Sequence, residues 1–282
     1  MRLAIDIATL ASVNFLLGLG IVTVYKGTRI LNFALPGVIL ATAYLTVTVA
    51  SHAPLVVALA AGALAAAGLG ALTFYVGILP VLGRPTYVGI LTTVAIGFML
   101  ESIVTIIWKA EIRNLDLPST SFTLGDRLVS SNQAIMWVAA LGAGILFGIV
   151  YRYTRVGLWL AATADKSLLA RQRGIPVMKV LLASFVIAAL LGYVVALLLG
   201  ARQGVTMALE SAGLRGLVVA LVGGLDSVLG AALAAVLLGS VEAWVVQTDP
   251  RLATVIPYMV LLAVLIWRPW GLLGTPEELE RV

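Results

Sequence analysis

The sequence predicts an all-α integral membrane protein, and three observations lead to this fold class. Of its 282 residues, 61% are hydrophobic and only 11% are charged. The mean hydropathy of +1.10 lies well above that of soluble domains. Apolar stretches of about 20 residues, the length that crosses a bilayer as a helix, follow one another from end to end.

These stretches predict about eight transmembrane helices in one membrane domain over residues 1–282, with at least one broken or re-entrant segment. The first stretch is too long for the core of a signal peptide and is expected to be a retained helix. The expected spans lie near residues 4–24, 30–50, 54–80, 86–108, 133–151, 180–200, 214–247 (the broken one) and 254–268.

The long polar interruption from Arg152 to Lys179 orients the chain. It holds six basic residues against one aspartate, a net charge of +5 that equals the formal charge of the whole protein. By the positive-inside rule this loop, 152–179, is cytoplasmic. If the spans alternate, Lys26 and Arg84 fall on the same side, and the segment 109–132 is an extracytoplasmic loop, either a connector or a docking surface.

The two ends of the chain follow less directly from this orientation. Alternation places the N-terminus outside. The tail after Arg268 is cytoplasmic only if the region 214–247 crosses twice or an earlier segment is re-entrant.

Composition also excludes several function classes. The chain has no cysteine and one histidine, His52, so thiolate metal sites, disulfides and a transition-metal centre are not expected. It lacks a GxxxxGK[ST] phosphate loop and therefore is not expected to hydrolyse ATP or to be an enzyme. Its basic residues lie in loops, where topology and anionic lipid account for them without nucleic acid.

A short helix is predicted inside the cytoplasmic loop. Asp165 is a suitable N-cap, and Gly174 a suitable residue just beyond the helix end. Two interpretations remain open: docking into a groove of a cytoplasmic partner, or packing against the chain's own bundle or the lipid headgroups. The residues that would make either contact are Leu168, Leu169, Ala170, Arg171 and Arg173.

Polar or flexible positions inside spans are candidates for a translocation pathway. Glu101 lies within an apolar run, and there either bonds a neighbouring helix or lines a pathway. The Gly223-Gly224 pair is either a helix break beside a pathway or a tight packing point. Asn32 either caps a helix or lines the pore. The remaining acids in or near spans, Asp6, Asp226 and Glu242, lie nearer their presumed ends.

Three blocks of sequence resemble the branched-chain amino acid (Liv-type) ABC importer permeases, most specifically the first of the two permease paralogues. In the cytoplasmic loop, Ala170 and Gly174 match the family's alanine and glycine four residues apart. The other two blocks are Tyr25-Lys26-Gly27 through Ile30-Leu31-Asn32-Phe33-Ala34, and Gly213-Leu214 through Val222-Gly223-Gly224-Leu225-Asp226-Ser227, Gly230-Ala231, Leu238-Gly239 and Glu242.

The resemblance implies a permease subunit of an ATP-driven importer in the inner (cytoplasmic) membrane. It implies three kinds of partner: a paralogous permease, two ABC ATPase subunits that bind ATP and Mg²⁺, and an extracytoplasmic solute-binding protein. No cofactor is expected in this chain itself. The loop helix, with Asp165, Leu168, Leu169, Ala170, Arg171, Arg173 and Gly174, would couple ATP hydrolysis to transport.

The chain departs from the family pattern in segments expected to face the pathway. Leu35 and Pro36 precede Gly37 where the family commonly has histidine and glycine, and Asp226 and Leu229 replace a usual glycine and proline. The substrate is therefore left open among branched-chain and other amino acids, amides and urea. Gly37 and Asp226 join Asn32, Glu101, Gly223 and Gly224 as pathway candidates.

Two other function classes make different demands on the sequence. A secondary transporter driven by an ion gradient would have paired membrane carboxylates and an inverted repeat, whereas the acids here look isolated. A membrane enzyme would need a cluster of His, Asp or Ser at one face, which one histidine does not favour.

Overall fold

The computed structural model describes residues 2–115, 117, 120–124, 127–249 and 251–275. In this part of the chain the only β-sheet is a two-stranded hairpin, β1 (Ser121–Leu124) with β2 (Arg127–Ser130). The predicted all-α class is therefore confirmed. The α-helices are α1 (Arg2–Thr28), α2 (Leu35–Ala50), α3 (Leu55–Leu72), α4 (Thr86–Trp108), α5 (Ser131–Tyr153), α6 (Arg155–Gln172), α7 (Val177–Gln203), α8 (Leu209–Gly223), α9 (Val228–Thr248) and α10 (Ile256–Trp267).

Every predicted apolar stretch corresponds to a helix. Six helical stretches of the described chain are long and apolar enough to cross a membrane: α1, α4, α5, α7, α9, and α3 together with a π-helical and 3₁₀ continuation to Val81. Helices α2 and α10 are shorter but equally apolar. The fold is thus a multi-pass helical bundle.

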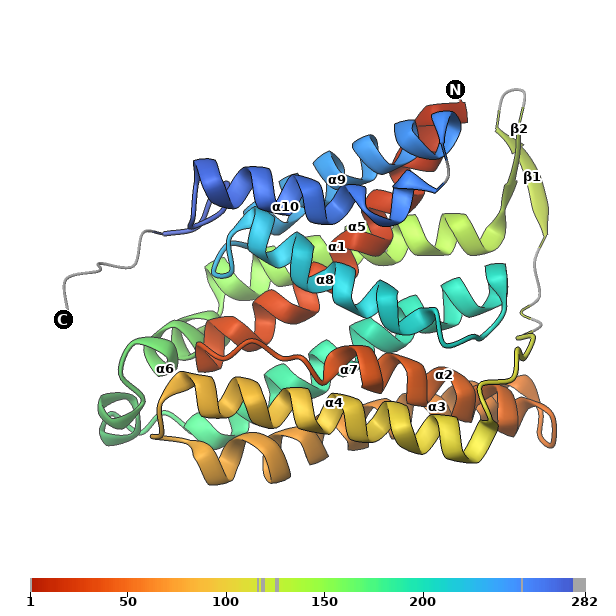
Figure 1. Cartoon of the computed structure of the whole chain (residues 1–282). Helices are drawn as coiled ribbons and strands as arrows, with labels where there is room; N and C mark the ends of the chain where they lie inside the picture. Colours follow the sequence, from red (N-terminus) through yellow and green to blue (C-terminus); the bar gives the residue numbers. More distant parts are fainter. Residues whose placement is uncertain (1, 116, 118–119, 125–126, 250, 276–282) are drawn as a thin grey trace.

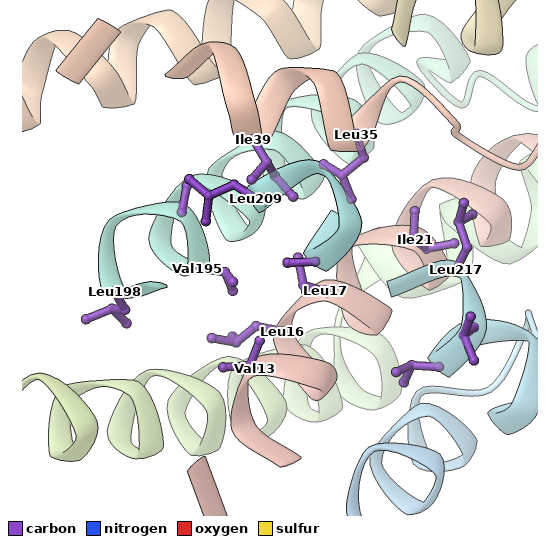
Figure 2. Close-up of a cluster of buried hydrophobic side chains, with 14 of the residues drawn as sticks. Val13, Leu16, Leu17, Ile21, Leu35, Ile39, Val195, Leu198, Leu209 and Leu217 are labelled. Atoms are coloured by element: carbon purple, nitrogen blue, oxygen red, sulfur yellow. The ribbon is translucent and has the colours of Figure 1, made fainter. Parts of the chain in front are cut away.

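Helix α1 is the centre of this bundle. It packs against α5, α7, α8 and α9, and its side chains Leu16, Leu17 and Ile21 are almost completely buried. Figure 2 shows Val13 and Leu16 of α1 in one cluster with side chains of α7, and Ile21 beside Leu217 of α8. A helix that is apolar and buried on all sides is a core helix.

The predicted broken segment is confirmed as two separate helices. Helix α8 ends at Gly223, and Gly224 has φ +107°, a left-handed conformation that favours glycine. Ser227 then caps α9, because its hydroxyl accepts a hydrogen bond from the Gly230 N–H at 2.9 Å. Figure 1 shows that the chain reverses direction between α8 and α9, which is the arrangement that a cytoplasmic tail would require of this region.

The distribution of basic residues among the loops agrees with the end of the bundle at which each loop lies. In Figure 1 helix α6 and the end of α1 lie at one end of the bundle, and the β1–β2 hairpin lies at the other. Helix α1 begins near the hairpin end, and α10 runs from that end toward the opposite one. The positive-inside rule predicts that the α6 end is cytoplasmic. The hairpin belongs to the loop predicted to be extracytoplasmic, and the backbone pair Arg113 and Val205 (2.7 and 3.1 Å) ties this loop to the α7–α8 connection.

This orientation predicts the labelling of single cysteines, since the natural chain has none. Cysteines at the exposed residues Arg173, after α6, and Thr123, in the hairpin, are expected to react with an impermeant thiol reagent from opposite sides of sealed vesicles. A cysteine at Arg251, before α10, is the control and should react from the same side as Thr123. Reaction of all three from one side would contradict the topology.

Candidate functional site

The helix in the loop 152–179, which is predicted to be cytoplasmic, is longer than the sequence analysis predicted. Helix α6 begins directly after Thr154, whose extended backbone (φ −114°, ψ 160°) separates it from α5. The prediction that Asp165 is an N-cap is therefore wrong, because Asp165 lies in the second half of a continuous helix. The segment from Arg155 to Ala164 contains no proline and continues the helix without interruption. The side chains of Asp165 and Leu168 lie outside the described residues.

The end of α6 matches the prediction made from Gly174. This residue has φ +79°, and its N–H donates to the Arg171 carbonyl at 3.0 Å. The Ile175 N–H reaches back to the Ala170 carbonyl at 3.1 Å. These two bonds form a Schellman motif, the helix ending that glycine adopts most easily.

The last turn of α6 has one buried and one exposed face. Ala170 is only 4% exposed and packs in a cluster with Val24 of α1 and Phe185 of α7. Leu169 is 50% exposed, and Arg171 and Arg173 are also exposed. The two interpretations of this helix are therefore compatible, because it rests on its own bundle through Ala170 and presents an apolar and basic surface outward.

A cavity of about 140 Å³ lies between α2, α4 and α8 and brings together part of the predicted pathway. Gly37 and Gly97 line it from α2 and α4, and Glu210 from the first turn of α8. Glu101 of α4 lies beside Glu210, within reach of a hydrogen bond between the two side chains. Glu101 thus faces a second acid from another helix, and the sequence analysis had not identified Glu210.

Asn32 and Gly37 also have structural roles. The Asn32 side chain is buried, and its Oδ1 accepts a hydrogen bond from the Ala34 N–H at 3.1 Å, which forms a local turn just before α2. Ala34 itself is the N-cap residue of α2, and no side chain caps this helix, so neither interpretation of Asn32 is confirmed. At Gly37 a Cβ atom would lie 2.7 Å from the Gly97 carbonyl oxygen. Glycine at both positions therefore allows α2 and α4 to pack closely.

Gly223, Gly224 and Asp226 lie far from that cavity. Glu210 and Gly223 are at opposite ends of α8, about 20 Å apart at 1.5 Å per residue. The structure thus divides the pathway candidates into two groups. At the cytoplasmic end, the pair Gly223 and Gly224 is both a helix break and a tight packing point.

The C-terminal segment closes over this break. The Leu272 and Leu273 N–H groups donate to the carbonyls of Val222 and Gly223 at 2.8 and 2.9 Å. The backbone N–H and the hydroxyl of Thr275 both bond the Asp226 carboxylate. Asp226 therefore fastens the C-terminal segment to the turn between α8 and α9.

A buried ion pair joins α8 to α9. Arg215 Nη1 donates to Glu242 Oε1 at 2.8 Å, and Glu242 is only 5% exposed. Asn14 of α1 is a further polar neighbour. The expectation of isolated acids near span ends is therefore wrong for Glu242. The signal that could have identified the pair was an arginine inside the apolar run 212–223, because buried charges are almost always paired.

Comparison with known proteins identifies the family. The family described as "Branched-chain amino acid transport system / permease component" matches residues 3–265, which is nearly the whole chain. This chain belongs to that permease family. Together with its apolar helices, this membership makes it a multi-pass protein of the inner membrane.

Individual relatives agree with this assignment. The high-affinity branched-chain amino acid transport system permease protein LivH of Escherichia coli K12 is 32% identical over 155 residues, 53% of this chain and 49% of the relative. LivH of Salmonella typhimurium gives the same values. BraD of Pseudomonas aeruginosa is 33% identical over 138 residues, 47% of this chain and 45% of the relative. The matches thus span about half the length of these relatives, and no solved structure matches.

Proposed function

We propose that this chain is the membrane-spanning permease subunit of an ATP-driven ABC importer for branched-chain or related amino acids. The observation that carries the proposal is the match of the permease family to residues 3–265. LivH and BraD are both named as permease proteins of high-affinity branched-chain amino acid transport systems. A gradient-driven secondary transporter is the alternative, and the family match disfavours it.

The proposed partners are a paralogous permease, two ABC ATPase subunits and an extracytoplasmic solute-binding protein. ATP and Mg²⁺ would bind to the ATPase subunits, and this chain would hold no cofactor. The exposed surface of Leu169, Arg171 and Arg173 at the end of α6 suits a groove on an ATPase subunit. Ala170, on the opposite face, links that surface to α1 and α7.

In this mechanism α6 transmits movement into the bundle. Its two ends continue into α5 and α7 through short connections, and it also packs against α1. Helix α1 in turn packs along both α8 and α9. Closure of the ATPase subunits would therefore bias the bundle between outward-open and inward-open states through rigid helices rather than a flexible linker.

The coupling role predicts the effect of substitutions at Gly174. Gly174→Val should reduce ATP hydrolysis stimulated by the solute-binding protein severalfold while leaving membrane insertion unchanged. A Cβ atom would meet no neighbour there, so the strain comes from the left-handed backbone alone. Gly174→Asn is the matched control, since asparagine tolerates this conformation. Full stimulation in the reconstituted Gly174→Val complex would count against the coupling role.

A pathway role for the cavity between α2, α4 and α8 predicts a separate phenotype at Glu101. Glu101→Gln keeps the shape of the side chain and removes its charge beside Glu210. We expect normal assembly with amino acid uptake reduced at least severalfold per assembled complex in proteoliposomes. Unchanged uptake would assign Glu101 a purely structural hydrogen bond. Unchanged uptake and assembly in Glu101→Leu as well would exclude both roles.

A further inference from the structure

A second, polar cavity lies at the extracytoplasmic end of the bundle, away from the cavity between α2, α4 and α8. Its volume is about 340 Å³, and it is lined by α1, α5, α7 and the hairpin and open to solvent at Arg202 and Ser121, both of which are exposed. The polar residues that line it include Arg202 at the end of α7, Asn132 and Gln133 at the start of α5, and Ser121 of β1. Among its described lining residues none is acidic, so its formal charge is positive.

Several lining groups already bond within the protein. The Thr9 hydroxyl donates to the Ile5 carbonyl at 2.9 Å and accepts from the Trp137 indole at 3.1 Å. Ser130 and Gln133 form a capping box, in which Gln133 Oε1 accepts from the Ser130 N–H at 3.2 Å. These groups therefore leave little acceptor capacity for a ligand.

The groups left over are mainly donors. Within the described chain, the Arg202 guanidinium makes no hydrogen bond or ion pair, and the side chains of Asn132 and Ser121 make none either. The Gln133 amide nitrogen is also free, because its oxygen holds the cap. The positive end of the 23-residue helix α5 lies at the same place. Free donors together with positive charge suit an oxyanion.

We propose that this cavity is a binding site for a small oxyanion, a carboxylate or a phosphate group, held by Arg202 with Asn132, Gln133 and Ser121. The proposal is independent of the transport function, because it uses none of the residues assigned to coupling or to the pathway. The same chemistry could come from a soluble anion or from the phosphate of a lipid headgroup in the outer leaflet. The two sources differ in whether the bilayer supplies the ligand.

The test is direct binding to the purified full-length chain in neutral detergent, by calorimetric titration with inorganic phosphate and with acetate. Wild type should bind at least one of them saturably. Arg202→Gln should weaken binding about 10- to 100-fold, the value of a charge-assisted hydrogen bond. Arg202→Lys should lie between the two, because lysine keeps the charge and loses the planar fork. Arg251→Gln removes an exposed arginine that does not line the cavity, and should bind like wild type.

Asn132→Asp provides a second variant of nearly unchanged volume. It places a negative charge in the cavity and should abolish binding even if Arg202→Gln does not fold. Nanodiscs identify the source of the ligand, because both phosphatidylcholine and phosphatidylglycerol carry a phosphate that the detergent lacks. Loss of phosphate binding on transfer from phospholipid-free detergent into nanodiscs would identify a lipid headgroup, and retained binding a soluble anion. The absence of saturable binding of both anions to wild type would overturn the proposal. Equal binding by wild type, Arg202→Gln and Asn132→Asp would do so as well.

Discussion

Arg215→Leu is expected to lower the free energy of unfolding by about 3–5 kcal/mol, because it leaves the Glu242 carboxylate buried without its cation. Glu242 Oε2 already has no hydrogen-bond partner among the described residues, and the polar neighbour Asn14 carries no charge that could replace that of Arg215. Glu242→Leu should have a similar but smaller effect, since the Arg215 side chain is 26% exposed and retains some contact with water.

The double substitution Arg215→Leu with Glu242→Leu distinguishes the contribution of the ion pair to stability from the contribution of side-chain packing at the same two positions. Replacing both members of a buried ion pair by apolar residues of similar size is often close to neutral, so it should recover most of the loss. The measurement is reversible unfolding of the purified chain in mixed micelles. Arg251→Leu, at an exposed position, should change the free energy by less than about 0.5 kcal/mol. A double variant as unstable as Arg215→Leu would show that the pair stabilises through packing rather than charge.

Local sequence rules were enough to predict the span positions and the break in this fold, whereas the orientation stays a prediction that the cysteine labelling tests. Span positions depend on apolar length, and orientation depends on the number of basic residues in loops. The break at Gly223-Gly224 could be predicted because glycine favours the left-handed backbone found at Gly224. The conformation of Gly174 follows from the same preference.

The contacts between distant segments could not be predicted in this way. The Arg215 and Glu242 side chains meet because α8 and α9 pack together, and no spacing along the chain encodes which faces of two apolar helices meet. The same holds for Glu210 beside Glu101.

The error at Asp165 has a different cause, because it concerns a choice between two local signals. Thr154 is a residue type that can begin a helix. Here its extended backbone ends α5 and begins α6, while its hydroxyl donates to the Val150 carbonyl at 2.6 Å and does not cap α6. The sequence alone did not decide between the two starts.

Gly223→Ala is expected to destabilise the chain by at least about 1–3 kcal/mol, the cost of inserting a methyl group into a closely packed site. A Cβ atom at Gly223 would overlap the backbone of Gly230 and lie 2.5 Å from the Ala231 nitrogen. These are backbone atoms, so relief requires α8 and α9 to move apart, and this movement would also disturb the bond from Leu273 to the Gly223 carbonyl.

Gly148→Ala is the matched control, because it adds the same methyl group to α5 at a position where a Cβ atom meets nothing within 4 Å. It should be neutral or stabilise by up to about 1 kcal/mol, since alanine is the better helix former. Both variants should be compared with wild type by unfolding in mixed micelles and by uptake per assembled complex. Equal stability of the two variants would mean that α8 and α9 separate at little cost. The turn between α8 and α9 would then be able to move during the transport cycle. A loss of stability and uptake in Gly223→Ala alone would instead assign this turn to the rigid part of the bundle, against which α6 moves.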